Sequence, residues 1–351
     1  MIDTLPATMP AIRKLEDAPG LDLVSEVPVP EVGPREVLIR VTHAGICGTD
    51  RHIYEWDAWS RSRVKVGITT GHELVGEVVK IGHAVNRTVV GTRVSAEGHI
   101  GCGTCEPCRT GNGHICVNVD IIGIDINGCF APYVVVPEEN IWPVHEDIPD
   151  RIAAVFDPLG NAVHTVMAAG VSGKTVLITG VGIIGLMSVT VAKAAGAGKI
   201  FVTDMDPRRL DLSRELGADE AFVATDPWPE HIRELTGGLG PHVMLEMSGS
   251  PHAIRDGLGV LRAGGTAAML GIPADDVTLN LSDLLIFKGA TLLGINGRKM
   301  FETWYQMENL ILSGMLNLDP IITHEIEMAD FESGFRMMQS GDAIKVVMRI
   351  T

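Results

Sequence analysis

An uncharged run between Lys174 and Lys193, TVLITGVGIIGLMSVTVA, constrains the fold of this chain more than any other segment. It is long enough to raise the question of a transmembrane helix. Its glycines, Gly180, Gly182 and Gly185, divide it into a short β-branched strand, a turn and a helix. We therefore expect a buried strand that leads into a buried helix within a soluble core.

The same glycines predict a dinucleotide site, because they form a GxGxxG string between a strand and a helix. The first glycine permits the turn, the second admits a pyrophosphate, and the third lets the helix approach the strand. Asp204 ends the next apolar segment, IFVTD, 24 residues beyond Gly180. A carboxylate there accepts hydrogen bonds from both ribose hydroxyls and repels a 2′-phosphate, which favours NAD over NADP. A domain of this fold with an empty crevice is the alternative.

Further cofactor contacts are expected near this turn and after the later strands of the same domain. Arg209 follows Asp206-Pro207 and can reach the adenosine, although a solvated helix face explains an arginine there equally well. The remaining predicted contacts are Ile184, Leu270, Gly271, Ile272, Ile295 and Asn296.

The chain is long enough for two domains, since 351 residues with 46% hydrophobic content exceed what one core holds. Residues 1–155 contain short β-rich runs, which predict a barrel-like domain. Residues 156–296 contain six apolar strands separated by helical patterns, which predict a doubly wound parallel six-stranded sheet of the Rossmann type. We expect residues 297–351 to pack back onto the first domain. The Asp-Pro pairs at 157 and 206 predict helix N-caps.

Charge and the N-terminus restrict the partners and the location. The net charge of −16 repels phosphate backbones and anionic lipid surfaces, so neither nucleic acid nor a membrane is an expected partner. The first residues contain no apolar signal-peptide core, which predicts a cytoplasmic protein.

Four cysteines follow one another as Cys102-x2-Cys105-x2-Cys108-x7-Cys116. Two-residue spacers let successive thiolates reach one tetrahedral Zn²⁺, and a closed shell of four sulfurs predicts a structural ion within a lobe at about residues 98–118. A disulfide pair and an iron–sulfur cluster are the alternatives. Cys129 lies outside this group and is expected to be a small buried side chain.

A second candidate metal group comprises Cys47 in the string CGTDRH and His72 and Glu73 in GHE. With these strings, the cysteine lobe and the late GxGxxG in this order, the chain resembles the zinc-dependent medium-chain dehydrogenases. The resemblance implies a GroES-like β-barrel catalytic domain, catalytic zinc held by the Cys-His-Glu group, and two Zn²⁺ per subunit. It also implies a proton relay through Thr49 and His52.

Two other residues near these motifs have competing interpretations. Asp157, the acid before PLGN, has a catalytic or second-sphere role by resemblance, whereas its residue chemistry is equally well explained by helix capping. His99 can touch substrate or relay protons, although a structural histidine is the simpler interpretation.

Longer strings narrow the resemblance to family members that oxidise the side-chain hydroxyl of L-threonine with NAD⁺ and form homotetramers. These strings are CGTDRHIYEWDAW, GHELVGEVV, EGHIGCGTCEPCR, FDPLGNAVHT, LEMSG, MLGIP and FETWYQM. Residues 123–133 and 294–298, including Asn296, depart from the family pattern, and neither segment is expected to touch a zinc ligand. They favour a polyol or secondary-alcohol dehydrogenase as the alternative enzyme. A protein that binds NADH and zinc without turnover is the alternative of another class.

Overall fold

The computed structural model describes residues 5–351 and divides them into two compact units. The first unit runs to Asp157 and includes Ile322–Thr351, and the second is Pro158–Ile321. The chain returns to the first unit at Ile322, later than residue 297, so helix α10 (Glu302–Leu312) belongs to the second unit. Within the described residues, no helix is long and apolar enough to span a membrane.

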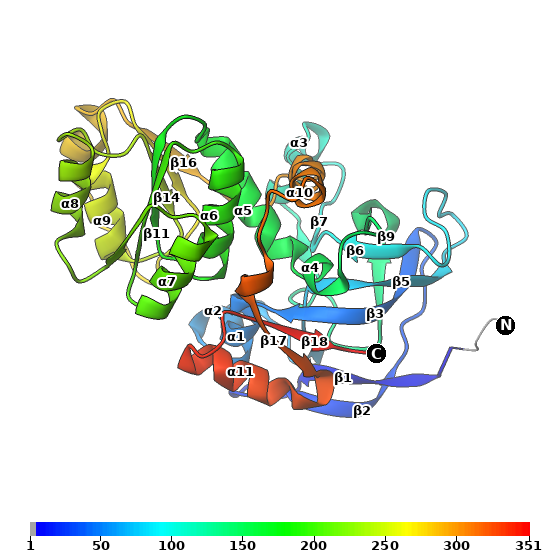
Figure 1. Cartoon of the computed structure of the whole chain (residues 1–351). Coiled ribbons are helices and arrows are strands. Elements are labelled where there is room, and N and C mark those ends of the chain that lie inside the picture. The colour runs from blue at the N-terminus through cyan, green and yellow to red at the C-terminus, as the bar shows by residue number, and fades with distance from the viewer. Residues whose placement is uncertain (1–4) are drawn as a thin grey trace. The chain divides into compact units, whose positions relative to one another are not determined.

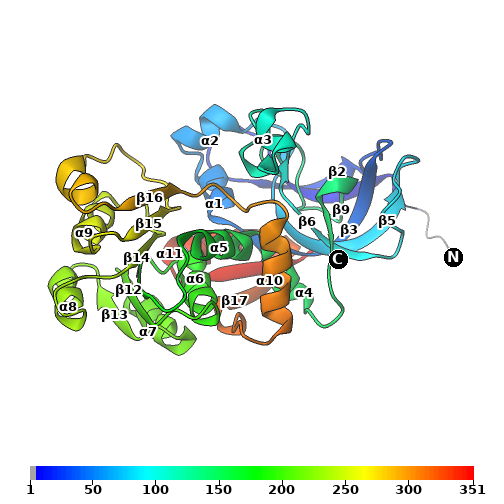
Figure 2. The ribbon, with the colours of Figure 1, turned by 90° about the horizontal axis from the view of Figure 1, so that it is seen from above.

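The second unit contains a six-stranded parallel sheet in the order β13-β12-β11-β14-β15-β16, which confirms the predicted doubly wound fold. Figure 2 shows β13 and β16 at its two edges. The order reverses between β11 and β14, where such sheets bind ligands beyond the carboxyl ends of their strands. The strands are β11 (Thr175–Thr179), β12 (Lys199–Asp204), β13 (Glu220–Val223), β14 (Val243–Glu246), β15 (Thr266–Met269) and β16 (Thr291–Gly294).

Helices cover both faces of this sheet. Figure 1 shows α6 (Ile183–Ala194) and α7 (Pro207–Leu216) on one face and α8 (Trp228–Leu235) and α9 (Pro251–Val260) on the other. Helix α6 is buried from Gly185 to Ala192, because it lies between the sheet and its neighbours. This burial explains why the run that resembled a membrane span contains no charge.

The two predicted helix caps have different outcomes. Asp206 caps α7 as predicted, since its side chain accepts a hydrogen bond from the Arg208 amide at 2.9 Å and Pro207 is the first helical residue. The prediction for Asp157 is wrong: α5 (Phe156–Ala169) begins at the residue before it, so Asp157 lies inside the first turn. Pro158 is tolerated there because the first turn of a helix does not use its amide donors.

The first unit is built around the long strand β3 (Glu36–Ile46), which lies in a sheet of order β10-β6-β5-β3-β18-β17, with β9 also paired to β3. A smaller sheet has the order β2-β1-β4. The remaining elements of the larger sheet are β5 (Glu73–Ile81), β6 (Arg93–Ala96), β9 (Tyr133–Pro137), β10 (Ile141–Pro143), β17 (Ile322–Glu327) and β18 (Lys345–Arg349). The smaller sheet contains β1 (Thr8–Lys14), β2 (Asp22–Pro28) and β4 (Ile68–Thr69).

The C-terminal segment completes the larger sheet. Strand β18 pairs antiparallel with β3, so Val346 lies opposite Ile46, and parallel with β17. Helix α11 (Phe331–Ser340) packs against α1 (Gly48–Glu55) through stacked rings of Tyr54 and Phe335, 4.6 Å apart. The last strand of the chain therefore reaches the end of β3, next to Cys47.

Candidate active site

The pairing of β3 with β5 brings the predicted metal ligands together. Gly45 lies opposite Glu73 in this antiparallel pair. Cys47 follows β3 as the residue before α1, and His72 immediately precedes β5. Their ligand atoms and that of Glu73 lie within 4.8 Å of one another, with His72 and Glu73 buried and Cys47 half-buried.

Two glycines make room for this group. A Cβ at Gly45 would lie 2.1 Å from Glu73 Oε2. Gly71 has a φ of 90°, and a Cβ there would lie 2.2 Å from the Phe130 ring. A larger residue at either position would displace the segment that carries His72 and Glu73.

Asp50 places a further carboxylate beneath the ligands. It is fully buried, its Oδ2 accepts the Cys47 amide at 2.9 Å, and its Oδ1 lies 3.8 Å from His72 Nδ1. Burial raises the pKa of Asp50, and the neighbouring His72 opposes this. Burial favours neutral His72, but the charges of Asp50 and Cys47 outweigh it and raise the pKa of His72 to about 10. The group therefore has an excess of negative charge that favours a cation.

Glu73 has a charged partner that the sequence analysis did not identify. Lys345 Nζ lies 2.5 Å from Glu73 Oε2 and donates to the Ile46 carbonyl at 2.8 Å, and both side chains are almost wholly buried. Burial raises the pKa of Glu73, while the Lys345 ammonium lowers it. The sequence signal was a lysine within the apolar strand AIKVVMRI.

The donor set fits zinc. One thiol, one imidazole and one carboxylate converge, and His72 Nδ1 and Asp50 Oδ1 are buried without a hydrogen-bond partner among residues 5–351. Sulfur, nitrogen and oxygen donors suit borderline Zn²⁺, and three protein ligands leave one tetrahedral position for a substrate oxygen.

The predicted relay residues lie on α1, just beyond Cys47. Thr49 is half-buried and His52 is exposed, and their spacing of three residues places them on one face of the helix. His52 Nδ1 lies 2.7 Å from Asp57 Oδ2.

Asp157 and His99 differ in their relation to the ligand group. Asp157 is buried and close enough to influence the pKa of both His72 and Glu73, although it is not among the converging ligand atoms. His99 lies on β7 (His99–Ile100), where its Nδ1 is 3.1 Å from Glu97 Oε1. A fixed imidazole paired with a buried carboxylate agrees with the structural interpretation of His99.

The expectation that residues 123–133, which depart from the family pattern, do not touch a zinc ligand is wrong. Cys129 Sγ donates to the backbone carbonyl of Glu73 at 3.5 Å, so residues 123–133 do touch a predicted ligand residue. Asn127 Oδ1 accepts the Thr69 amide at 3.0 Å, which ties the same segment to the strand that leads to His72. The contact was not foreseen because it depends on the long-range pairing of this loop.

The four-cysteine group also converges. Its sulfur atoms lie within 4.8 Å of one another, and all six cysteines are free thiols. The Cys105–Cys116 sulfur distance of 3.7 Å agrees with the roughly 3.8 Å expected between thiolates on tetrahedral zinc, and far exceeds a disulfide bond. Hydrogen bonds from Thr104 lower the pKa of Cys102 to about 5, which favours the thiolate that a metal needs.

The glycine turn of the second unit has the features of a phosphate site. Gly180 has a φ of 84°, and a Cβ at Gly185 would lie 2.1 Å from the Gly180 carbonyl. Gly182 precedes α6 and has open space where a side chain would lie. The helix N-terminus therefore offers free amides to an anion.

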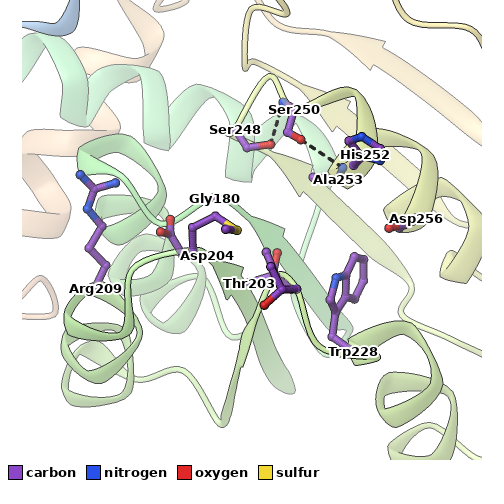
Figure 3. A pocket seen from close by; sticks show the side chains of 13 residues that line it. Gly180, Thr203, Asp204, Arg209, Trp228, Ser248, Ser250, His252, Ala253 and Asp256 are labelled. Carbon is purple, nitrogen blue, oxygen red and sulfur yellow. Dashed lines mark hydrogen bonds between the residues drawn. The ribbon is translucent and has the colours of Figure 1, made fainter. Parts of the chain in front are cut away.

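A cavity of about 440 Å³ lies beside this turn, and in Figure 3 Arg209 and Asp204 lie on the opposite side of it from Trp228 and Asp256. Asp204 Oδ2 accepts the Val181 amide at 2.7 Å, which fixes the carboxylate at the end of β12. The lining residues are Gly180, Thr203, Asp204, Met205, Arg209, Ala224, Thr225, Trp228, Ser248, Ser250, His252, Ala253 and Asp256.

Other predicted cofactor contacts lie outside this lining. Gly182, Ile184 and Gly185 lie at the start of α6. The others follow the carboxyl ends of β15 and β16, namely Leu270, Gly271, Ile272, Ile295 and Asn296. Trp228, His252 and Asp256 also line the cavity and were not predicted from the sequence; they come from the segments after β13 and β14. Their position could have been predicted, because the segments that follow the carboxyl ends of parallel strands are where such sheets bind ligands.

Comparisons with known proteins agree with this architecture. Residues 184–313 match the zinc-binding dehydrogenase family, and residues 33–146 match the alcohol dehydrogenase GroES-like domain. The chain belongs to the zinc-binding dehydrogenases, which confirms the resemblance found in the sequence.

Its similarity to particular members is high. It is 47% identical to an L-threonine 3-dehydrogenase of Symbiobacterium thermophilum over 97% of both chains. It is 46% identical to an L-threonine 3-dehydrogenase of Bacillus subtilis, covering 97% of this chain and 98% of that protein. The crystal structure of 2R,3R-butanediol dehydrogenase from Bacillus subtilis is 26% identical, with a TM-score of 0.88 over 98% of this chain and 100% of that one.

Proposed function

We propose that this protein oxidises the side-chain hydroxyl of L-threonine with NAD⁺, giving 2-amino-3-oxobutanoate and NADH. The observation that carries the proposal is the convergence of Cys47, His72 and Glu73 in a chain that matches L-threonine 3-dehydrogenases over nearly its whole length. The first unit is the catalytic domain and the second is the NAD-binding domain.

Cys47, His72 and Glu73 hold the catalytic metal in this proposal, and the four-cysteine group holds a structural one. Bound zinc supplies Lewis acidity to the substrate hydroxyl, and bound NAD⁺ supplies the hydride acceptor. Asp50 and Asp157 contribute negative charge around the three ligands. The half-buried position of Cys47 leaves the group accessible to substrate from one side.

The chain's own contribution to proton movement comes from α1. Thr49 accepts the hydroxyl proton and passes its own to His52, which releases a proton to solvent. The support is positional, because both residues follow Cys47 on one helix face and His52 is exposed. An imidazole suits this role since one ring nitrogen can accept a proton and later release it.

The second unit selects and orients the cofactor. The pyrophosphate binds at the N-terminus of α6, and Asp204 accepts hydrogen bonds from the adenosine ribose. Its carboxylate disfavours NADP by repulsion of the 2′-phosphate. Arg209 lines the same cavity from the first turn of α7.

We infer that the protein is a cytoplasmic homotetramer. Strand β16 is an edge strand, and large apolar side chains on it and nearby are exposed, namely Ile272, Leu281, Ile286, Phe287 and Leu292. Exposed apolar side chains and an open strand edge both favour association with another chain. Size-exclusion chromatography with light scattering measures the subunit number.

A polyol or secondary-alcohol dehydrogenase is the second candidate. The observation in its favour is the contact between Cys129 and the Glu73 backbone, because it places the departing segment 123–133 against the ligand group. A change in the side chains of this segment would alter the shape of the substrate site, and so which substrate fits beside the ligand group.

The decisive experiment measures NADH formation at 340 nm by the zinc-loaded protein. L-Threonine with NAD⁺ is compared with D-threonine, L-serine, sorbitol and 2,3-butanediol, and NAD⁺ with NADP⁺. We expect turnover with L-threonine and NAD⁺ alone. Turnover of a diol or polyol without threonine supports the second candidate. NADH binding without any turnover supports the non-catalytic alternative.

A further inference from the structure

The exposed relay histidine has a fixed carboxylate partner. His52 Nδ1 lies 2.7 Å from Oδ2 of Asp57, five residues further along the chain. An ionised carboxylate can only accept a hydrogen bond, so Nδ1 must carry a proton in this pair. The second ring nitrogen, Nε2, then has a lone pair in the neutral imidazole.

The Asp57 carboxylate is itself held in place. It caps α2 (Ala58–Arg63), and its Oδ1 accepts the Ser60 amide at 2.9 Å and lies 2.6 Å from the Ser60 hydroxyl. Burial opposes ionisation, but the hydrogen bonds from Ser60 and His52 outweigh it and lower the pKa of Asp57 to about 2. One oxygen thus serves the helix cap and the other serves His52.

The turn between the two helices fixes the distance between this pair. Trp56 ends α1 in the left-handed conformation, with a φ of 56°. Its amide donates to the His52 carbonyl at 2.9 Å, and its indole nitrogen donates to Asp17 at 2.5 Å. Lys14 Nζ lies 4.2 Å from the centre of the Trp56 ring. Contacts from the β1–β2 segment therefore hold the turn that presents Asp57 to His52.

We propose that Asp57 is a positioning residue for proton transfer, which keeps the His52 proton on Nδ1 and leaves Nε2 as the proton acceptor. The proposal rests on the relay role of His52 in the proposed function. In each turnover Nε2 accepts the proton that leaves the Thr49 hydroxyl, as Thr49 takes the substrate proton. The imidazolium then releases the Nε2 proton to solvent, which regenerates the same tautomer.

Two substitutions at one position separate this role from helix capping. Asp57→Asn keeps an acceptor for the Ser60 amide, but its amide group donates toward His52 Nδ1 and so forces the proton onto Nε2. Asp57→Ser also keeps a cap acceptor, but it is too short to reach His52 and leaves both tautomers available. Asparagine is the closer match in size, yet we expect it to be the more damaging change.

The expected result is a fall in kcat of about 10- to 100-fold for Asp57→Asn, with the KM for substrate and the Kd for NADH within about twofold. Asp57→Ser loses about threefold to tenfold, since part of the histidine population keeps a free Nε2. The matched control is Glu55→Gln, which removes a carboxylate from the same helix that pairs with Arg51 and Gln339. We expect its kcat within about twofold of the unchanged protein.

A spectroscopic measurement on the zinc-loaded protein reports the tautomer directly. Nitrogen-15 NMR of the His52 ring should show hydrogen on Nδ1 in the unchanged protein and in Glu55→Gln, and on Nε2 in Asp57→Asn. An unchanged tautomer in Asp57→Asn overturns the proposal, as does a kcat for Asp57→Ser at or below that for Asp57→Asn.

The relay itself is tested with His52→Asn. If this variant turns over at the normal rate, the relay part of the proposed function fails, whatever Asp57 does. If His52→Asn is inactive while Asp57→Asn retains full kcat, the relay stands and the positioning role of Asp57 is refuted. If both lower kcat, the double variant should be no slower than His52→Asn alone, because the two residues act as one unit.

Discussion

Replacing Lys345 with methionine should destabilise the zinc-free first unit, because it leaves the buried Glu73 carboxylate without its counter-charge. At the 2.5 Å separation of Nζ and Oε2, the attraction is about 7 kcal/mol for an effective dielectric constant of 20. Most of this offsets the desolvation of the two groups, and removing one partner of a buried pair costs about 3–5 kcal/mol. For a unit of this size we expect Tm to fall by roughly 6–20 °C.

The metal should reduce this cost. Zinc beside Glu73 supplies positive charge in place of the ammonium, so Lys345→Met should be less destabilising in the zinc-loaded protein. The double variant Lys345→Met/Glu73→Gln removes the stranded charge and should recover most of the loss.

Urea unfolding, followed by hydrogen exchange in peptides from β3, measures the free energy of the first unit separately from the second. The unchanged protein, both single variants and the double variant are compared with and without zinc. A loss below about 1 kcal/mol in zinc-free Lys345→Met, or a double variant no more stable than that single variant, refutes the reasoning.

Three further predictions concern other parts of the chain. His43 and Arg93, which lie beside Asp150, lower the pKa of its carboxyl well below the usual range. The stability that this ionised carboxylate contributes is therefore present above about pH 4 and is lost as pH falls further. Asp150→Asn should therefore lower the free energy of unfolding by about 1.5–3 kcal/mol at pH 7. The difference in this free energy between the variant and the unchanged protein should shrink below about pH 4, and a difference that stays constant with pH in urea titrations would contradict this. Cys105→Ser should reduce the zinc content by one ion per chain in atomic absorption measurements, and unchanged content would exclude the four-cysteine site. Asp204→Ser should raise the affinity for NADPH at least about tenfold by fluorescence titration, and an unchanged NADPH affinity would exclude Asp204 as the discriminating residue.

Local sequence patterns predicted the parts of the molecule that depend on near neighbours. The six strands of the second unit, the α7 cap at Asp206 and the grouping of four cysteines all arise from spacings of a few residues. The Asp157 prediction was wrong because the same Asp-Pro signal is compatible with a cap or with the first helical turn, and α5 already begins at Phe156.

Contacts between distant segments were beyond such patterns. The Lys345–Glu73 pair depends on β18 lying beside β3, and the Cys129 contact depends on the path of residues 123–133. A lysine in an apolar strand indicates an unusual environment, but its partner follows only from the sheet order. The His52–Asp57 pair is local in sequence, yet it requires the left-handed turn at Trp56, a conformation that a tryptophan rarely adopts.

The late return of the chain to the first unit affects the order of events during synthesis. A ribosome releases Cys47, His72 and Glu73 long before Lys345, so Glu73 emerges without the ammonium partner that it has in the complete chain. The second unit is continuous in sequence, so it can fold before β18 has been synthesised and has paired with β3. The counter-charge of the ligand group is thereby linked to completion of the polypeptide, and a chain that terminates before residue 345 lacks both the β18 partner of β3 and the charge that stabilises Glu73.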